Sequence, residues 1–138
     1  MAVVALGVSA GALAAPAVAD AAFNDSAAAT MAVTSDVLLP ATSPAAGPGT
    51  CTPLSTDRIV LTWTATASTW ADGYEVARGT SAGGPYTVIA SVSAATTTYT
   101  DSSLSFSTTY HYAIRAKRNA WRSADATTSR TTRNSFCG

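Results

Sequence analysis

The 138 residues of this chain suffice for one domain of ordinary size and leave some residues over. Only 12% are charged and the formal net charge is zero, although all eight basic residues fall in residues 51–138, against five acids. That imbalance is far below the basic stripe of nucleic-acid-binding domains, so we predict no nucleic-acid partner.

The chain begins with an apolar, uncharged run over residues 3–19 that ends in Ala17-Val18-Ala19 and is followed by Asp20. A small-x-small ending is typical of signal-peptidase cleavage. The run only just reaches bilayer-spanning length and is rich in weakly hydrophobic alanine and glycine. We predict a signal-peptide-like segment over residues 1–19, a secreted or cell-surface protein, and no stable membrane span after cleavage. The usual basic n-region is missing, so the export signal would be unusual unless the true start codon lies upstream. An uncleaved anchor is the alternative.

The next stretch contains Phe23-Asn24-Asp25, which resembles the Phe-x-Asp segment after the signal in small exported proteins of high-GC Gram-positive bacteria. That resemblance implies a pilin-like or matrix-like protein as one possible function. A short strand is possible over residues 31–39, and three prolines and two glycines in residues 40–49 predict a linker. We therefore expect residues 20–46 to be a largely disordered segment and linker, and residues 47–138 to form the folded domain.

Short β-strands are predicted through the rest of the chain, because apolar and polar residues alternate between turn signals rich in glycine, serine and proline. The first ends at Thr50-Cys51, and the others cover residues 59–64, 73–78, 86–92, 96–101, 104–117 and 122–132. In residues 86–92 the apolar parity changes between Val88 and Ile89, which a β-bulge would reconcile. The residues on the inward faces form the predicted core: Leu61, Trp63, Tyr74, Val76, Tyr99, Leu104, Tyr110, Tyr112 and Ile114.

The clearest pattern is in the strand that starts near Leu104. From Tyr110 onward, residues expected to face the core alternate with residues expected to face solvent. The inward set is Tyr110, Tyr112, Ile114 and Ala116, and the outward set is His111, Ala113, Arg115 and Lys117. Seven such strands in about 88 residues predict an all-β, seven-stranded Greek-key β-sandwich.

The spacing of Leu104, Thr108 and Tyr110 resembles the start of strand F in fibronectin type III domains. There a tyrosine hydroxyl bonds back to the preceding chain, an arrangement called the tyrosine corner. Trp63 also stands where these domains keep a core tryptophan, on their second strand. The resemblance spans roughly residues 46–137 and implies an immunoglobulin-like sandwich; it implies little about the ligand.

The two cysteines, Cys51 and Cys137, are too few for a zinc site, and the only histidine, His111, lies in mid-strand. We predict no metal. In a seven-stranded sandwich the first and last strands end at the same pole. We therefore predict a Cys51–Cys137 disulfide, provided that the protein reaches an oxidising compartment.

No catalytic constellation, phosphate-binding loop or cofactor motif is present, and we predict that the protein is not an enzyme and needs no cofactor. Two loops at the pole opposite the cysteines instead form the candidate binding surface, which comprises Trp70, Asp72, Arg118, Asn119, Trp121 and Arg122. Trp and Arg are frequent interaction hot spots, and aromatic rings also stack on sugars. The alternative is that Trp70 and Trp121 pack on each other and only cap the core.

These features predict a secreted, non-enzymatic module for adhesion, spacing or assembly at the cell surface. Its partner would be a protein or a cell-surface polysaccharide. The alternatives are a carbohydrate-binding accessory module that uses Trp70 and Trp121, and a pilin-like exported protein.

Overall fold

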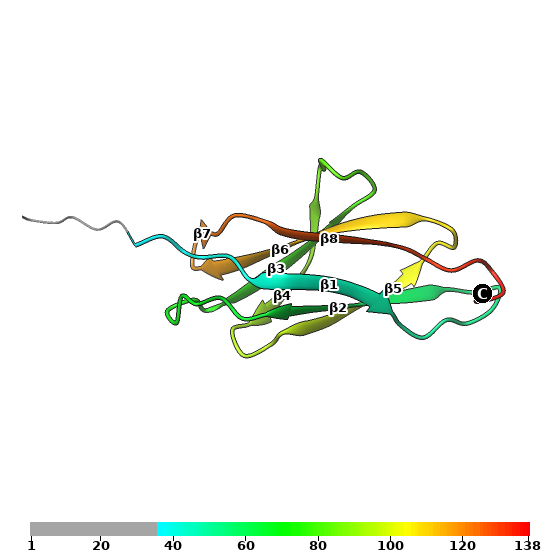
Figure 1. Ribbon diagram of the computed structural model, residues 1–138, viewed down its shortest axis with the longest axis horizontal. Helices are drawn as coiled ribbons and strands as arrows, with labels where there is room; N and C mark the ends of the chain where they lie inside the picture. Colours follow the sequence, from blue (N-terminus) through cyan, green and yellow to red (C-terminus); the bar gives the residue numbers. More distant parts are fainter. Residues whose placement is uncertain (1–35) are drawn as a thin grey trace, which may run out of the picture. The chain divides into compact units, whose positions relative to one another are not determined.

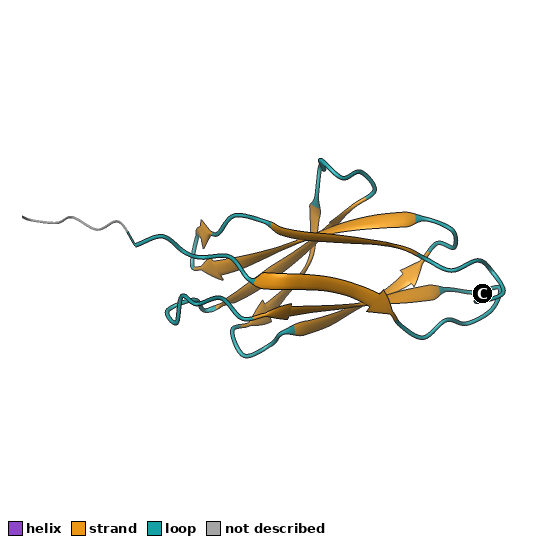
Figure 2. Ribbon diagram, in the orientation of Figure 1, coloured by secondary structure: helices purple, strands orange, loops and turns teal. Residues whose placement is uncertain are grey.

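The computed structural model describes residues 36–138, and these residues form strands, turns and loops without a helix. The strands are β1 (Thr42–Pro48), β2 (Asp57–Thr64), β3 (Gly73–Gly79), β4 (Thr87–Ser93), β5 (Thr98–Leu104), β6 (Thr109–Arg118), β7 (Trp121–Arg122) and β8 (Ala126–Thr131). One antiparallel sheet has the order β1-β2-β5; in the other, β4 pairs with β3, β3 with β6, and β6 with both β7 and β8. The sheets face each other as a sandwich, which confirms the predicted fold class (Figures 1 and 2).

The core lies between the two sheets and follows the predicted alternation. In β2, Ile59, Leu61 and Trp63 are buried while the residues between them are not, and in β6 the inward set is buried. Every predicted core residue is buried except Tyr99, which is partly buried and packs against the others. Burying a large apolar side chain contributes about 1.5–3 kcal/mol, so the alternation of these strands accounts for much of the drive to fold.

The approach to β6 contains the predicted tyrosine corner. The Tyr110 hydroxyl accepts a hydrogen bond from the Ser105 amide at 3.2 Å, and Leu104 beside it is 2% exposed. The spacing from Leu104 to Tyr110 therefore fixes the chain where it crosses from one sheet to the other.

An ion pair between the sheets was missed by the sequence analysis. Arg78 of β3 turns inward, and its Nη1 donates to both carboxylate oxygens of Asp101 in β5 at 3.0 Å. The Tyr112 hydroxyl donates to the same carboxylate at 2.8 Å. Burial, followed by the contact with Asp101, raises the pKa of Tyr112. The buried acid thus has a cation and a hydroxyl as partners, as a buried carboxylate requires.

The predicted linker over residues 40–49 was wrong, because Thr42–Pro48 is strand β1. Prolines are tolerated there since β1 is an edge strand whose register shifts between Thr42 and Ala45. Leu38 and Ala41 also join the core, so the folded domain starts before residue 47, at the latest by Leu38. Of the possible strand over residues 31–39, residues 36–39 are not in a strand. Residues 31–35, the signal-like segment and the Phe23-Asp25 stretch lie outside the described residues.

Two further details of the strands test the sequence predictions. The predicted bulge in β4 is confirmed, since Val76 pairs with Ala90 and Ala77 with Val88, which leaves Ile89 as the extra residue. The predicted outward residue Ala113 is instead fully buried.

The last predicted strand, residues 122–132, is interrupted between β7 and β8. At this break the Ser123 hydroxyl accepts the Ala116 amide at 2.9 Å and donates to the Ala124 carbonyl at 2.8 Å. A serine side chain thus replaces part of the backbone ladder, which the Thr/Ser-rich sequence did not reveal.

Candidate functional site

The loop between β2 and β3 meets the β6–β7 hairpin at one end of the sandwich, which we call the tryptophan pole (Trp70, Asp72, Arg118, Asn119 and Trp121). Backbone and side-chain hydrogen bonds join the two segments. The Asp72 amide donates to the Lys117 carbonyl at 2.9 Å, the Asn119 amide donates to the Asp72 carboxylate at 2.8 Å, and Arg118 donates to the Trp70 carbonyl. The structure thus brings the two predicted loops together.

The β6–β7 hairpin has only two connecting residues, Asn119 and Ala120. Asn119 has a φ of 52°, a left-handed conformation that asparagine tolerates better than most residues. Arg122 then holds the hairpin down. Its guanidinium pairs with Glu75 of β3, with Nη2 to Oε1 at 3.0 Å, and Nη1 donates to the Asn119 and Trp121 carbonyls. The contact with Glu75 raises the pKa of Arg122.

Asp72 and Arg122 were predicted as binding residues, but their charged groups are engaged within the protein. The Asn119 amide, and then Lys117 at 3.7 Å, lower the pKa of Asp72. Both side chains therefore position the two loops, and neither lines the pocket described next.

The two tryptophans contact each other edge to face, with ring centroids 6.2 Å apart and planes at 82°. Trp70 is partly buried and packs against the core, whereas Trp121 is 60% exposed. The Arg118 guanidinium lies 5.9 Å from the centre of the Trp70 ring. Trp70 therefore caps the core as the alternative hypothesis held, but Trp121 presents most of its indole to solvent.

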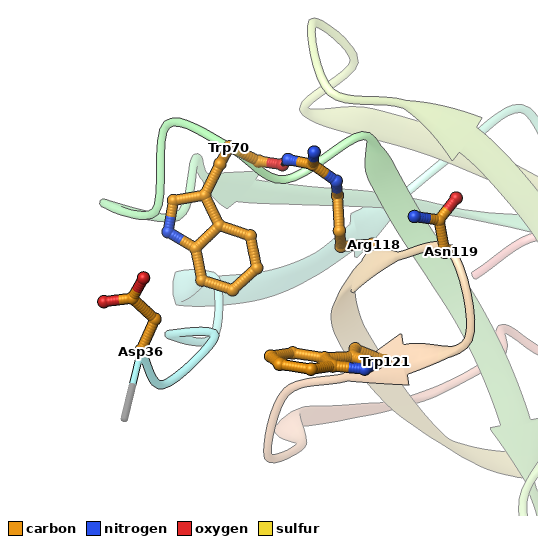
Figure 3. Close-up of a pocket in the computed structure, with 5 residues that line it drawn as sticks. All are labelled: Asp36, Trp70, Arg118, Asn119 and Trp121. Carbon is orange, nitrogen blue, oxygen red and sulfur yellow. Dashed lines mark hydrogen bonds between the residues drawn. The ribbon is translucent and has the colours of Figure 1, made fainter. Parts of the chain in front are cut away.

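A pocket of about 490 Å³ lies at this pole, lined by Asp36, Trp70, Arg118, Asn119 and Trp121 (Figure 3). Asp36 was not predicted, because it falls in the segment expected to be disordered. The chain just after it is held against the β2–β3 loop: the Leu39 amide donates to Ser68 Oγ at 3.0 Å and Thr66 Oγ1 donates to the Leu39 carbonyl at 2.6 Å. Apolar Val37, Leu38 and Leu39 were the available sign that this segment is attached to the domain.

The lining combines two indole rings, a guanidinium, an amide and a carboxylate. Such a set can stack on a planar or ring-shaped group and hydrogen-bond its polar edge. Within residues 36–138 there is no group of three or more His, Cys, Asp or Glu side chains able to hold a metal. Stacking and hydrogen bonding are the contacts that this lining offers to a ligand.

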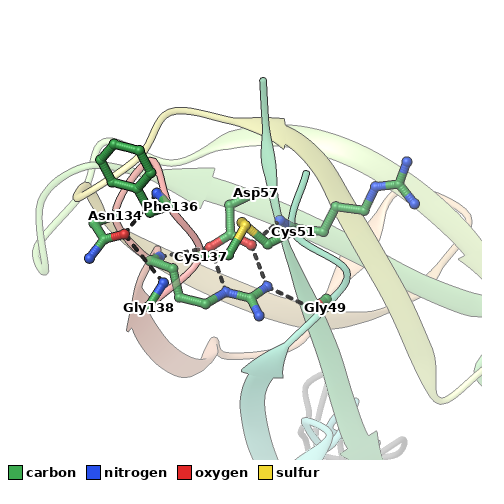
Figure 4. Close-up of a disulfide and its surroundings, with 9 residues drawn as sticks. Gly49, Cys51, Asp57, Asn134, Phe136, Cys137 and Gly138 are labelled. Atoms are coloured by element: carbon green, nitrogen blue, oxygen red, sulfur yellow. Dashed lines mark hydrogen bonds and ion pairs between the residues drawn. A yellow bond between two sulfur atoms is a disulfide. The ribbon is translucent and has the colours of Figure 1, made fainter. Parts of the chain in front are cut away.

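The opposite end contains the Cys51–Cys137 disulfide, with Cα atoms 5.8 Å apart, and we call it the disulfide pole (Figure 4). Beside it, the buried Asp57 accepts the Arg133 amide at 2.7 Å and pairs with the Arg133 guanidinium at 2.5 Å. Arg133 also donates to the Gly49 carbonyl at 2.7 Å. Chiefly through the contact with Arg133, the pKa of Asp57 falls from 3.8 to about 2.

Two large apolar side chains project from the disulfide pole: Leu54 is 75% exposed and Phe136 is 76% exposed. The Leu54 amide donates to the Ser135 carbonyl at 2.8 Å, and Asn134 Oδ1 accepts the Phe136 amide at 2.8 Å.

No helix among the described residues is long and apolar enough to cross a membrane.

No protein-family model and no curated protein matches this chain. Among solved structures, a fibronectin type III-like protein from Clostridium thermocellum is 29% identical, with a TM-score of 0.57, over 68% of this chain and 92% of its own. The domain FN3tt is 25% identical, with a TM-score of 0.58, over 72% of this chain and 98% of its own. A domain of the human collagen alpha-1(XX) chain, 21% identical with a TM-score of 0.58, shares the fold over 75% of this chain and 93% of its own.

Proposed function

We propose that this fibronectin type III domain protein is a secreted, non-enzymatic binding module that serves adhesion, spacing or assembly at the cell surface. We further propose that the tryptophan pole is its binding surface. The observation that carries the proposal is Trp121, which is 60% exposed on a two-residue hairpin that Arg122 and Asp72 hold in place. A large aromatic ring on a rigid support loses little entropy on binding, which is why such residues dominate interfaces.

Secretion is supported by two features of the chain. The disulfide at Cys51 and Cys137 is stable in oxidising compartments, and residues 1–19 have the pattern of an export signal. The absence of a catalytic pattern in the sequence, together with a pocket lined for stacking and hydrogen bonding, supports binding rather than catalysis.

A second candidate function is carbohydrate binding, because the pocket sets indole rings beside Asn119 and Arg118. Pyranose rings stack their C–H face on indole while amide and guanidinium groups bond their hydroxyls. A protein partner would use the same tryptophan as a hot spot. The two candidates therefore share a surface and differ in the chemical nature of the partner.

The test is a sedimentation assay of the purified protein with cell envelopes from the producing organism. We expect the wild type to bind, and Trp121→Ala to lower the apparent affinity by about tenfold or more, as hot-spot truncations do. Val88→Ala is the matched control, since Val88 is a large exposed apolar residue on β4 that does not line the pocket. Equal binding by wild type and Trp121→Ala would refute the tryptophan pole as the binding surface.

Pretreatment of the envelopes separates the two candidates. Protease should abolish binding to a protein partner, whereas periodate, which cleaves vicinal diols of sugars, should abolish binding to a polysaccharide.

A further inference from the structure

The exposed apolar side chains of this domain gather at its two ends. Six large ones are exposed in the described part of the chain: Val37, Leu39, Leu54, Val88, Trp121 and Phe136. All except Val88 belong to one pole or the other. Val37, Leu39 and Trp121 lie at the tryptophan pole, near β7 in Figure 1, and Leu54 and Phe136 lie at the disulfide pole, where the chain ends. Exposed apolar clusters of this kind mark interaction surfaces.

The side chains of Leu54 and Phe136, which we call the apolar tip, project from a fixed backbone. The disulfide joins the two loops that carry them, and the hydrogen bond from the Leu54 amide to Ser135 adds a second link. Asn134 Oδ1 accepts the amides of both Phe136 and Gly138, at 2.8 and 3.2 Å, and so fixes the turn around Phe136 (Figure 4). The apolar tip is thus organised before binding, which reduces the entropy lost on association.

The pocket at the other pole offers an aromatic site for such a side chain. Its volume of about 490 Å³ accommodates a phenyl ring, and its walls present the rings of Trp70 and Trp121 (Figure 3). Aromatic pairs with centroids about 4.5–7 Å apart add about 0.5–1.5 kcal/mol beyond the apolar area that they bury.

Each pole also carries an exposed charged side chain that takes no part in the ion pairs among the described residues. Five ion pairs join charged side chains within residues 36–138, and neither Asp36 nor Arg58 takes part in one. Asp36 is exposed in the wall of the pocket. Arg58 is exposed at the disulfide pole, where its carbonyl accepts the Gly49 amide at 2.9 Å. Arg118 in the same pocket wall also takes part in no ion pair among the described residues, so the specific charge contact that we test is that of Asp36 with Arg58 of another molecule.

We infer that the partner of the tryptophan pole is a second copy of this chain, whose apolar tip enters the pocket. The inference rests on the proposed function, in that it takes the tryptophan pole as a binding surface. Because the donor and acceptor surfaces lie at opposite ends of the domain, the contact is heterologous and propagates into an open head-to-tail chain instead of closing as a symmetric dimer. The apolar tip buries little surface in the pocket. Each association step is therefore weak, with a Kd on the order of micromolar to millimolar.

The test is sedimentation equilibrium of the full chain in its exported form, over a range of concentrations that spans this Kd. The average mass should rise with concentration and pass the mass of a dimer. Phe136→Ala, which removes the apolar tip, and Trp121→Ala, which removes one wall of the pocket, should each lower the association constant by about tenfold or more. Val88→Ala should associate like the wild type.

Mixing the two defective variants gives the sharpest result. Phe136→Ala retains an intact pocket and Trp121→Ala retains an intact apolar tip, so an equimolar mixture should form heterodimers and stop there. Three outcomes overturn the inference: a wild type that stays monomeric, association that is lost in only one of the two variants, and a mixture that stays monomeric. Loss in only one variant would indicate a symmetric contact of one pole with itself.

Exchanging the charges of Arg58 and Asp36 is an independent test of the same contact. Arg58→Glu should weaken association by about two- to fivefold, as expected for an exposed ion pair, and adding Asp36→Lys to the same chain should restore it. Envelope binding that depends on Trp121, in a protein that remains monomeric, would overturn head-to-tail assembly and leave the proposed function standing. Self-association that does not depend on Trp121 would overturn head-to-tail assembly alone, whereas envelope binding that does not depend on Trp121 would overturn the proposed function.

Discussion

The two poles of the sandwich use their polar groups in opposite ways. At the disulfide pole, a buried carboxylate, Asp57, pairs with Arg133, and a covalent bond joins the loops that precede β2 and follow β8. At the tryptophan pole, Asp72 and Arg122 are exposed, and they tie two loops to the ends of β3 and β6.

The links at the disulfide pole stabilise the whole fold, and the links at the tryptophan pole position a surface. Removing the disulfide affects the whole domain, because every unfolded conformation regains the freedom that the bond removed. Removing one partner of the buried ion pair also does so, because the other charge is left buried without compensation. Removing an exposed link affects the local loop, because solvent replaces most of the lost interaction. Substitutions at the disulfide pole should therefore lower the stability of the whole domain, whereas substitutions at the tryptophan pole should mainly change local order.

The largest expected effect is at the disulfide pole. Replacing both cysteines, with Cys51→Ser and Cys137→Ser, opens a loop of 86 residues and should lower the free energy of unfolding by about 4–5 kcal/mol. Urea unfolding of the wild type with and without reductant should reproduce the difference. A loss below about 1 kcal/mol would mean that the non-covalent contacts close this pole on their own.

The next effect depends on pH. The folded pKa of Asp57 is about 2, below its ordinary 3.8, so its contribution is fully present above about pH 5 and is lost as pH falls toward 2. The shift corresponds to about 2 kcal/mol. Since other acids also titrate in this window, the reference is Asp57→Asn, which cannot. The stability difference between wild type and variant should shrink by about that amount from pH 5 to pH 2, and a pH-independent difference would contradict the assignment.

The features that depend on a local pattern of residues were predictable from the sequence. Alternation around Tyr110 and Trp63 predicted the strands and their inward faces, and the spacing of Leu104 and Tyr110, which resembles that in fibronectin type III domains, implied the tyrosine corner. The change of parity at Ile89 correctly indicated a bulge, because an inserted residue leaves its trace in the order of side chains. Strand direction alone was enough to bring Cys51 and Cys137 to one pole.

The roles of side chains whose contacts lie far away in the sequence could not be predicted from local pattern. Arg78 looks like a surface residue until Asp101 and Tyr112 are found beside it, 23 and 34 positions away in sequence. Asp36 reaches the pocket because the segment after it is attached to the β2–β3 loop, for example by the hydrogen bond of Leu39 with Ser68, 29 positions away. Asp72 and Arg122 were predicted as binding residues, and only their contacts with distant partners show that their charged groups are engaged within the protein.

Within the tryptophan pole, the two tryptophans should respond differently to truncation. Trp70→Ala removes a side chain packed on the core and should cost about 2 kcal/mol of stability, whereas Trp121→Ala should cost about 1 kcal/mol or less. For variants that still fold, the loss of envelope binding should have the reverse order, with Trp121→Ala the larger, because Trp121 presents the larger exposed surface. Paired urea titrations and envelope sedimentation of both variants test this, and equal costs to stability would contradict the division between a capping and a binding tryptophan.

The smallest change in stability should come from Asp72→Ala, because Asp72 is exposed and solvent screens its contact with Lys117. Its local effect should be larger, since the carboxylate is the acceptor for the Asn119 amide at the turn of the hairpin. Amide exchange at Asn119 should accelerate by about tenfold, while exchange in β2 and in the body of β6 stays unchanged. Thr127→Ala, on the exposed surface of β8, is the control that should alter neither. Unchanged exchange at Asn119 would show that the remaining contacts, among them that of Arg122 with Glu75, are enough to hold the hairpin. Faster exchange together with weaker envelope binding would link the order of this loop to recognition by Trp121.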